Sequence, residues 1–317
     1  MRTARQLSYF FTALLMHSVI FPLPIQAADL RLQLQQQEDQ LNFNYQFKIN
    51  GQPQQLAFSL SKNVVANHFR EFRPLKPALM QQYLWRDMQK LAGSFPGVRL
   101  QRLPGRQALN YRISAGDQAQ RDELQQQLTE LIQNRRREYL QQAYYHEIRW
   151  PDRQRVIVPD HQRLMQDSLQ DLLPVATALH ASVLQMEVRQ AINFIAQWIQ
   201  QIPYQDLSDR LNSSGASFSP PLRLLRENRG DCDSKAVLLA SLIRMLLPDL
   251  KLAMVYLPNH AVLAIQMTPS QSDMTVTIGA ASYILIDATG PALLPPGEIS
   301  PEYRPFTQSG AFAYQLL

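Results

Sequence analysis

Gly230-Asp231-Cys232-Asp233-Ser234-Lys235-Ala236 leads directly into Val237–Leu247, an almost wholly apolar run in which Arg244 is the only charge. A helix that is apolar nearly all round has to be buried, so this stretch predicts a helix at the centre of a domain. The glycine and aspartate that precede the cysteine supply the tight turn and the cap that begin such a helix. Cys232 is therefore expected at the N-terminus of a central helix.

That position matters for the chemistry of the thiol. The unpaired N–H groups and the dipole of a helix N-terminus favour negative charge, so we expect them to favour the thiolate of Cys232. The same N–H groups can stabilise the oxyanion that forms when a thiolate attacks an acyl carbon. Cys232 is the only cysteine of the chain, so no intramolecular disulfide can form. The competing interpretation is an inert, buried cysteine, which is common among free cysteines.

A thiolate nucleophile needs a partner that protonates the leaving group, and histidine suits this role near neutral pH. His260 follows the break Pro258-Asn259, between a predicted strand at Lys251–Leu257 and a second one at Ala261–Met267. The histidine therefore lies at the start of the second strand.

A further apolar strand, Tyr283–Ile286, ends at Asp287, just before a turn. If this strand pairs antiparallel with the strand after His260, the start of one lies opposite the end of the other. Asp287 would then be a cross-strand neighbour of His260, and its carboxylate could orient the imidazole. The order Cys232, His260, Asp287 follows the nucleophile, base and orienting-group logic of a catalytic triad.

These motifs together resemble the transglutaminase-like superfamily of papain-related enzymes. The resemblance rests on Gly230-Asp231-Cys232-Asp233, Asn259-His260-Ala261-Val262, Leu285-Ile286-Asp287-Ala288-Thr289 and the upstream stretch Ile195–Tyr204. It covers residues 183–291 and implies a central cysteine-bearing helix packed on an antiparallel sheet. It also implies that Cys232 is the nucleophile, His260 the general acid and base, and Asp287 the orienting carboxylate.

The implied activity is a cysteine peptidase or amidase that hydrolyses amide bonds of a protein, peptide or peptidoglycan-type substrate. Two alternatives remain open at this point: a transamidating cross-linker, and a non-catalytic binding or assembly module on the same fold, because a fold does not determine a function. Alkylation of the cysteine and the effect of Cys232→Ala would discriminate between them.

The chain departs from the family pattern in two places. The interval between His260 and Asp287 is longer than in the compact family core, which predicts an inserted hairpin or loop near Thr268–Ala281. The side chain that completes the oxyanion site is not obvious: Tyr204 and Gln205 are the candidates, and the backbone N–H of Cys232 is the safer donor.

No cofactor and no metal are assigned. Some exported members of the family that the chain resembles depend on calcium, which makes four carboxylates candidate ligands: Asp206, Asp209, Asp231 and Asp233. An acidic residue beside a helix start is more often a cap, so none of them is assigned to a metal. His146 and His161 lack the paired spacing of a zinc site and are expected at the surface. Arg229 and Lys235, which flank the site, are expected to be solvated, and Asp233 and Ser234 are expected to cap the helix.

The first 28 residues are typical of a secretory signal peptide, with Arg2 and Arg5 before an apolar stretch that ends at Pro22. We therefore expect a periplasmic or secreted protein without a transmembrane segment in the mature chain. A net charge of +5 does not indicate a nucleic-acid binder, because the only dense basic run, Arg135-Arg136-Arg137, is typical of a solvated helix face.

The remaining sequence predicts an α+β chain with four parts: the signal peptide (1–28), an N-terminal α+β domain (29–150), a connecting segment (151–182) and the transglutaminase-like domain (183–317). In the N-terminal part we expect alternating strands at Leu30–Gln36, Gln40–Ile49 and Gln54–Leu60, and a long helix from Asp117. This domain carries no catalytic motif, and a protein partner is possible for it.

Overall fold

A computed structural model describes residues 30–72, 74–104, 109–207 and 218–317. The expected signal peptide and Asp209 lie outside these described residues. In chain order the elements are β1 (Arg31–Gln37), β2 (Gln40–Ile49), β3 (Gln52–Ser61), α1 (Lys62–Glu71), α2 (Pro77–Ala92), β4 (Arg99–Arg102), β5 (Tyr111–Ser114), α3 (Gln118–Gln142), β6 (Tyr145–Arg149), β7 (Arg155–Pro159), α4 (His161–Ser168), α5 (Leu173–Val183), α6 (Val188–Gln200), α7 (Pro221–Glu227), α8 (Cys232–Leu246), β8 (Leu252–Leu257), β9 (His260–Ile265), β10 (Thr275–Ile278), β11 (Ala281–Ile286), η1 (Pro301–Tyr303), α9 (Arg304–Ser309) and β12 (Ala313–Leu316). The α+β class predicted from the sequence is confirmed.

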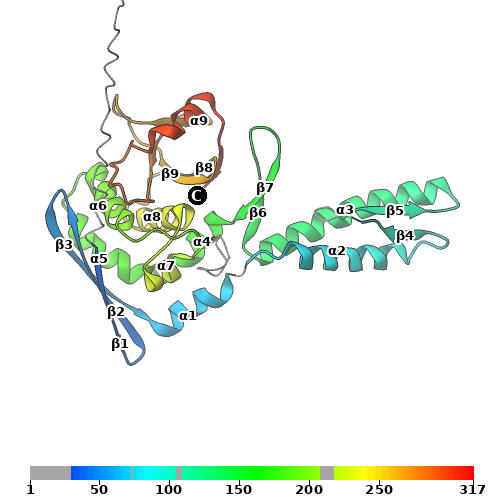
Figure 1. Cartoon of the computed structure of the whole chain (residues 1–317), viewed down its shortest axis with the longest axis horizontal. Coiled ribbons are helices and arrows are strands. Elements are labelled where there is room, and N and C mark those ends of the chain that lie inside the picture. The colour runs from blue at the N-terminus through cyan, green and yellow to red at the C-terminus, as the bar shows by residue number, and fades with distance from the viewer. Residues whose placement is uncertain (1–29, 73, 105–108, 208–217) are drawn as a thin grey trace, which may run out of the picture.

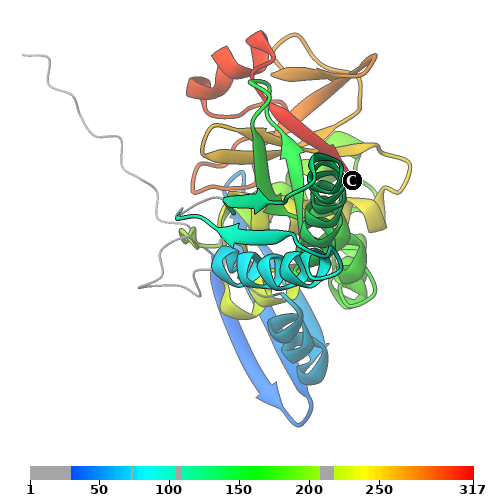
Figure 2. The same cartoon turned by 90° about the vertical axis from the view of Figure 1, so that its right-hand side faces the viewer.

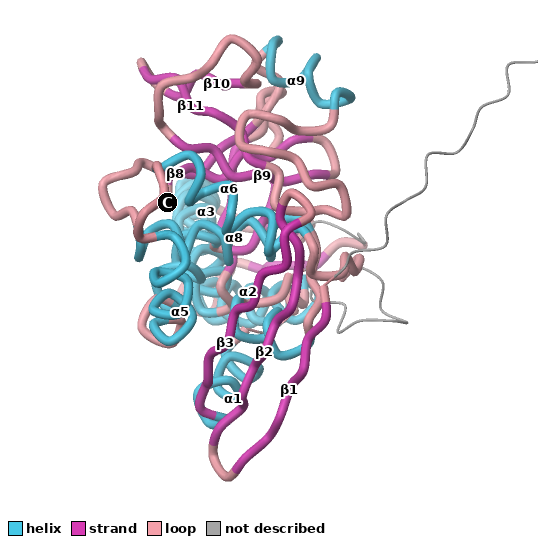
Figure 3. The backbone as a smooth tube through the Cα atoms, turned by 90° about the vertical axis from the view of Figure 1, so that its left-hand side faces the viewer, coloured by secondary structure: helices cyan, strands magenta, loops and turns pink. Residues whose placement is uncertain are grey.

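The N-terminal strands form a three-stranded antiparallel sheet in the order β1-β2-β3. Asn50 and Gly51, both with positive φ, make the turn between β2 and β3, as such a pair commonly does. Alternate residues of β2 are buried, and they lie on the face that covers α5 and α6 (Figure 3). On this face the ring of Tyr45 meets that of Trp198 edge-on, with centroids 5.4 Å apart.

This sheet shares its hydrophobic core with the C-terminal half of the chain. A single cluster of buried side chains contains β2 and β3 together with α5, α6, α8 and β9. The main hydrophobic core therefore continues across residue 150, where the N-terminal domain was expected to end.

The part that does stand apart is an arm made of α2, α3 and the β4–β5 hairpin, which projects from the body (Figure 1). Its own small core is formed by Met88, Ala92, Leu124 and Leu128. The side chain of Asp117 caps α3 by accepting a hydrogen bond from the N–H of Ala119 at 3.0 Å. At the base of the arm, the β6–β7 hairpin leads the chain back to the body.

Residues 151–182, expected to connect two units, are built into the body. β7 and α4 lie at the start of this segment, and α5 forms most of its second half. Met165, Leu172 and Leu179 are almost completely buried in the main cluster. Among the described residues, none of the helices has both the length and the apolar composition that a membrane-spanning helix requires.

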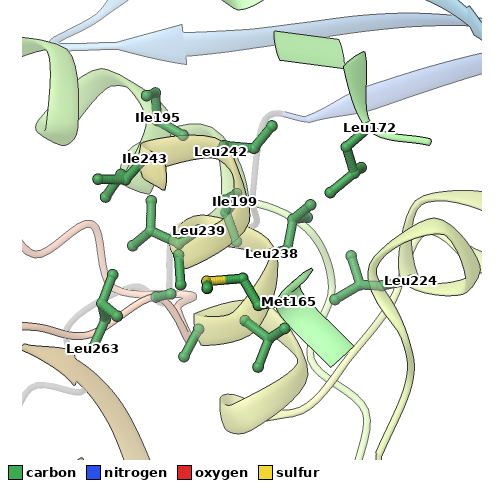
Figure 4. Packing of buried hydrophobic residues seen from close by; sticks show 14 of the residues in the cluster. Met165, Leu172, Ile195, Ile199, Leu224, Leu238, Leu239, Leu242, Ile243 and Leu263 are labelled. Carbon is green, nitrogen blue, oxygen red and sulfur yellow. The ribbon is translucent and has the colours of Figure 1, made fainter. Parts of the chain in front are cut away.

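A five-stranded antiparallel sheet, in the order β10-β11-β9-β8-β12, carries the C-terminal half. α8 packs against β9 and is buried along most of its length, as its apolar sequence predicts (Figure 4). The other face of the sheet is covered by a second cluster, to which Ile299, Tyr303 and Phe306 contribute. The hairpin expected between His260 and Asp287 is confirmed, because β10 pairs with β11 at the sheet edge.

Candidate active site

Cys232 is the first residue of α8, as predicted, and Asp231 is the N-cap residue. Gly230, which precedes the cap, is held by a parallel bridge to Tyr204. A Cβ at Gly230 would lie 2.6 Å from a methyl carbon of Leu224, so a larger residue would force that side chain to move. The tight approach of the chain before Cys232 thus accounts for the glycine.

His260 begins β9 and Asp287 directly follows β11. Asn259, with φ of 57°, closes the two-residue turn that pairs Leu257 with His260. β11 and β9 pair antiparallel with Ile286 opposite Leu263, so the end of one strand lies beside the start of the other. The cross-strand arrangement expected from the sequence is therefore confirmed.

The imidazole and the carboxylate are in direct contact. His260 Nε2 lies 2.9 Å from Asp287 Oδ2, and each side chain is 9% exposed. Asp287 Oδ1 also accepts a hydrogen bond from the N–H of Thr289 at 2.9 Å. Burial alone would raise the pKa of Asp287, but the hydrogen bond and the charge of His260 hold this pKa below its usual range. Asp287 therefore stays ionised and fixes the ring through Nε2.

Cys232, His260 and Asp287 line one cavity of about 380 Å³, so the structure brings the three predicted residues together. Because Nε2 of His260 is engaged by Asp287, Nδ1 is the ring nitrogen left for the thiol. Of the two oxyanion candidates, Tyr204 lines this cavity and Gln205 is not among its described lining residues. Burial and nearby Cys232 raise the pKa of the Tyr204 phenol to about 12, so its hydroxyl keeps its proton.

The thiol itself differs from the expectation. Burial raises the pKa of Cys232 above its ordinary value, and the neighbouring Asp233 and Asp231 raise it further. Backbone N–H groups, including that of Ala261, act in the opposite direction but more weakly. Burial is the largest of these effects, so the resting cysteine is a neutral thiol and the thiolate expected from the helix position is not favoured.

An aromatic ring that also lines the cavity covers one face of the imidazole. Tyr303, at the end of η1, stacks on His260 with ring centroids 4.7 Å apart and an interplanar angle of 18°. Tyr303 packs against the second hydrophobic cluster, to which Ile299 and Phe306 also belong, and this packing supports its ring. Stacking at this distance restricts rotation of the imidazole.

Lys235 lies one turn after Cys232 and is completely buried, so the prediction that it is a solvated flanking charge was wrong. Its Nζ donates hydrogen bonds to the carbonyl oxygens of Ile202 and Thr289. Burial lowers the pKa of Lys235 to about 7. The ammonium thus connects the turn after Asp287 with the segment that follows α6. The sequence signal for this role was the position of Lys235 near the start of a helix that is apolar nearly all round.

Gln200, the last residue of α6, supports the same turn. Its side-chain amide donates to the carbonyl oxygen of Asp287 at 2.6 Å and to that of Leu294 at 2.9 Å. Gly290 passes so close to α6 that a Cβ there would lie 1.9 Å from the carbonyl oxygen of Gln200. No pattern in the sequence indicates this role for Gln200, because the chain is rich in glutamine and one more glutamine does not stand out.

His161 is also buried, at 1% exposure, so its predicted surface position was wrong. Its Nδ1 lies 2.7 Å from the Tyr256 hydroxyl and its Nε2 lies 3.0 Å from Asp233 Oδ2. Burial lowers the pKa of His161 to about 3, so the ring is neutral. Burial also raises the pKa of Asp233 to about 6.

The remaining flanking residues behave closer to expectation. His146 keeps about a quarter of its side chain exposed and faces Asp160 at 3.6 Å. Arg229 is 47% exposed beside Glu227, as expected of a solvated charge. Asp233 and Ser234 do take part at the start of α8, since Asp233 Oδ1 accepts from the N–H of Ser234 at 2.8 Å, together with the N-cap Asp231.

Comparison of the chain with protein-family models, with curated proteins and with solved structures found no match.

Proposed function

We propose that this protein is an exported, thiol-dependent enzyme that hydrolyses amide bonds of peptides or of cell-envelope material, a cysteine peptidase or amidase of the transglutaminase-like class. The observation that carries the proposal is the 2.9 Å contact between His260 and Asp287 inside the cavity that Cys232 also lines. Nucleophile, base and orienting group then lie in the order of a triad. The sequence motifs around each residue support the same class.

The geometry suggests how the proton moves. Since Asp287 is ionised and accepts the hydrogen bond, Nε2 of His260 carries the hydrogen and Nδ1 presents a lone pair. Because the resting thiol is neutral, His260 acts first as a general base and takes the thiol proton as Cys232 attacks the carbonyl. The imidazolium is stabilised by Asp287 and then protonates the departing amine.

The tetrahedral intermediate carries a negative oxygen that needs hydrogen-bond donors. The N–H groups in the first turn of a helix have no partner within the helix, so the N–H of Cys232 at the start of α8 suits this role. The protonated hydroxyl of Tyr204 lines the same cavity and is the second donor that we propose. Water then hydrolyses the thioester and regenerates the thiol.

The single cysteine makes a direct test possible. We expect iodoacetamide to modify the intact protein once, at Cys232, with a rate at pH 7 that falls at least about tenfold in His260→Ala because the general base is lost. The matched control is His146→Ala, which removes a histidine outside the cavity. Equal alkylation rates in both variants would contradict the proposed base.

The reaction is tested with an envelope extract incubated with wild type or Cys232→Ala, with released peptides and amines measured by mass spectrometry. Products that need Cys232 support hydrolysis. Incorporation of a fluorescent primary amine into extract proteins would instead indicate transamidation. If the two proteins release identical products and incorporate no amine, the protein is a non-catalytic module and the proposal fails.

A further inference from the structure

A second, larger hollow lies far along the chain from the candidate triad, at the base of the arm. It measures about 790 Å³ and lies between the last turns of α3 and the β6–β7 hairpin. Figure 1 shows this hairpin rising beside the end of α3, and Figure 2 shows the same region with the arm facing the viewer. We call it the arm groove.

The arm groove is rich in positive charge. Arg136 and Arg137 line it from α3, and Arg155 lines it from β7. Glu147 is the one acidic side chain in its described lining. Its carboxylate forms ion pairs with two of the arginines: with Arg136, and with Arg155 at an Oε2–Nη1 distance of 3.7 Å. Arg137 is exposed and has no ion-pair partner among the described residues.

This charge is not explained by the fold alone. The last turn of α3 holds no basic residue, so the helix dipole does not account for Arg136 and Arg137, which lie earlier in the helix. Arg155 comes from the hairpin and brings a further like charge to the same hollow. Nε of Arg136 is also buried without an acceptor among the described residues. A bound group with carboxylates would relieve both features.

The hollow also has an apolar side. Leu140 and Tyr145 are buried beneath it, and Ile132 is partly exposed along α3. Ile132, Arg136 and Leu140 are spaced by four residues, so apolar and basic side chains alternate along one face of the helix. Such a surface is complementary to an extended chain whose groove-facing residues, every second one along that chain, are in turn acidic and apolar.

We propose that the arm groove binds an extended polypeptide segment that carries acidic side chains among apolar ones. The arm would then hold a protein partner at a site separate from the cavity of Cys232. This inference does not rest on the proposed enzymatic function, and Cys232→Ala is expected to leave binding unchanged.

The test uses the full chain and a fluorescein-labelled ten-residue peptide that repeats Glu-Ser-Leu-Ser, so that glutamate and leucine fall on the same face of the extended peptide. Binding is followed by fluorescence anisotropy. We expect the double variant Arg137→Glu/Arg155→Glu to bind at least about tenfold more weakly at 150 mM salt. The matched control is Arg112→Glu/Arg121→Glu, which makes the same charge change on exposed arm residues outside the groove. All four side chains are exposed, so equal melting temperatures should show that both variants are folded.

Four results would overturn the proposal. The first is absence of binding to wild type, and the second is equal weakening in both double variants, which would show a response to net charge only. The third is undiminished binding of the matching peptide with glutamine in place of glutamate, which would show that carboxylates are not recognised. The fourth concerns a different ligand. If inorganic polyphosphate displaces the peptide and loses affinity in the groove variant alone, the groove recognises an anionic polymer and the polypeptide assignment is wrong.

Discussion

Lys235→Met tests whether a buried ammonium supports the turn behind the candidate triad. The pKa of Lys235 is lowered from its ordinary value of 10.5 to about 7 by burial, a difference of about 5 kcal/mol between the two protonation states. The unfolded chain therefore binds more protons than the folded chain between these two pH values. The free energy of unfolding should rise with pH across this window, by up to about 1.4 kcal/mol per pH unit.

The methionine variant lacks this contribution and should show no such rise. It also leaves the carbonyl oxygens of Ile202 and Thr289 without their donor, at about 1–3 kcal/mol each. Near pH 6 the loss of these hydrogen bonds and the removal of a buried charge offset one another, so variant and wild type should be similarly stable. By pH 9.5 the wild type should have gained about 3 kcal/mol that the variant has not.

The assay is urea unfolding at constant ionic strength from pH 6 to pH 9.5, followed by tryptophan fluorescence. The upper limit lies below the ordinary pKa of tyrosine, which is about 10. Lys251→Met, at an exposed position, is the control and should keep the wild-type slope. Parallel pH dependences for wild type and Lys235→Met would refute the reasoning, because the proton uptake would then belong to another group.

Three further predictions concern the site. Asp287→Asn should lower turnover by about 10²–10⁴-fold without unfolding the chain, since an amide no longer fixes the required tautomer of His260; wild-type product release would contradict this. Gly290→Ala should lower the free energy of unfolding by at least about 2 kcal/mol, because φ is +67° and the new Cβ would meet the last carbonyl oxygen of α6. Gly310→Ala is the control: φ is +73° but no atom lies near the new Cβ, so thermal melts should show a smaller loss. Tyr303→Ala should slow alkylation of the cysteine at pH 7 while Tyr303→Phe keeps the wild-type rate, because only the stacked ring restrains the imidazole; equal rates would exclude that role.

The helix and strand ends that form the candidate site were predictable because their signals are local. The apolar run after Cys232 and the break before His260 each depend on a few adjacent residues, and α8 and β9 begin where those signals lie. The pairing of β11 with β9 was a condition of the prediction, and the structure shows it. The site geometry could therefore be anticipated without knowledge of the rest of the fold.

The errors concern polar side chains whose surroundings come from distant parts of the chain. His161 follows Asp160 in a polar stretch, and its neighbours Tyr256 and Asp233 come from parts of the chain that are distant in sequence. The local sequence therefore does not show that His161 is buried. Lys235 is expected at the surface when only its charge is considered, but it lies in the part of α8 that is buried from Ser234 to Ile243. The raised pKa of the Cys232 thiol has the same origin, because its largest cause is burial by segments that come from other parts of the chain.

The extent of the N-terminal domain was equally beyond local signals. The alternating strands of residues 31–61 predict a sheet with one apolar face, but nothing in them states what covers that face. In the structure the cover is α5 and α6, which lie more than a hundred residues later in the chain. Packing between such distant segments has no periodicity that a single sequence displays.

The edge-on contact of Tyr45 with Trp198 joins the beginning of the chain to the helix that leads into the cysteine loop. Unfolding of the first sheet would expose the apolar face of α6, so loss of the N-terminal strands and loss of the triad should occur in one cooperative transition. A protease that cleaves within residues 31–61 would therefore inactivate the thiol as surely as one that cleaves beside it. For the same reason, a fragment that begins at residue 183 is not expected to hold Cys232, His260 and Asp287 in place, although it contains all the motifs around them.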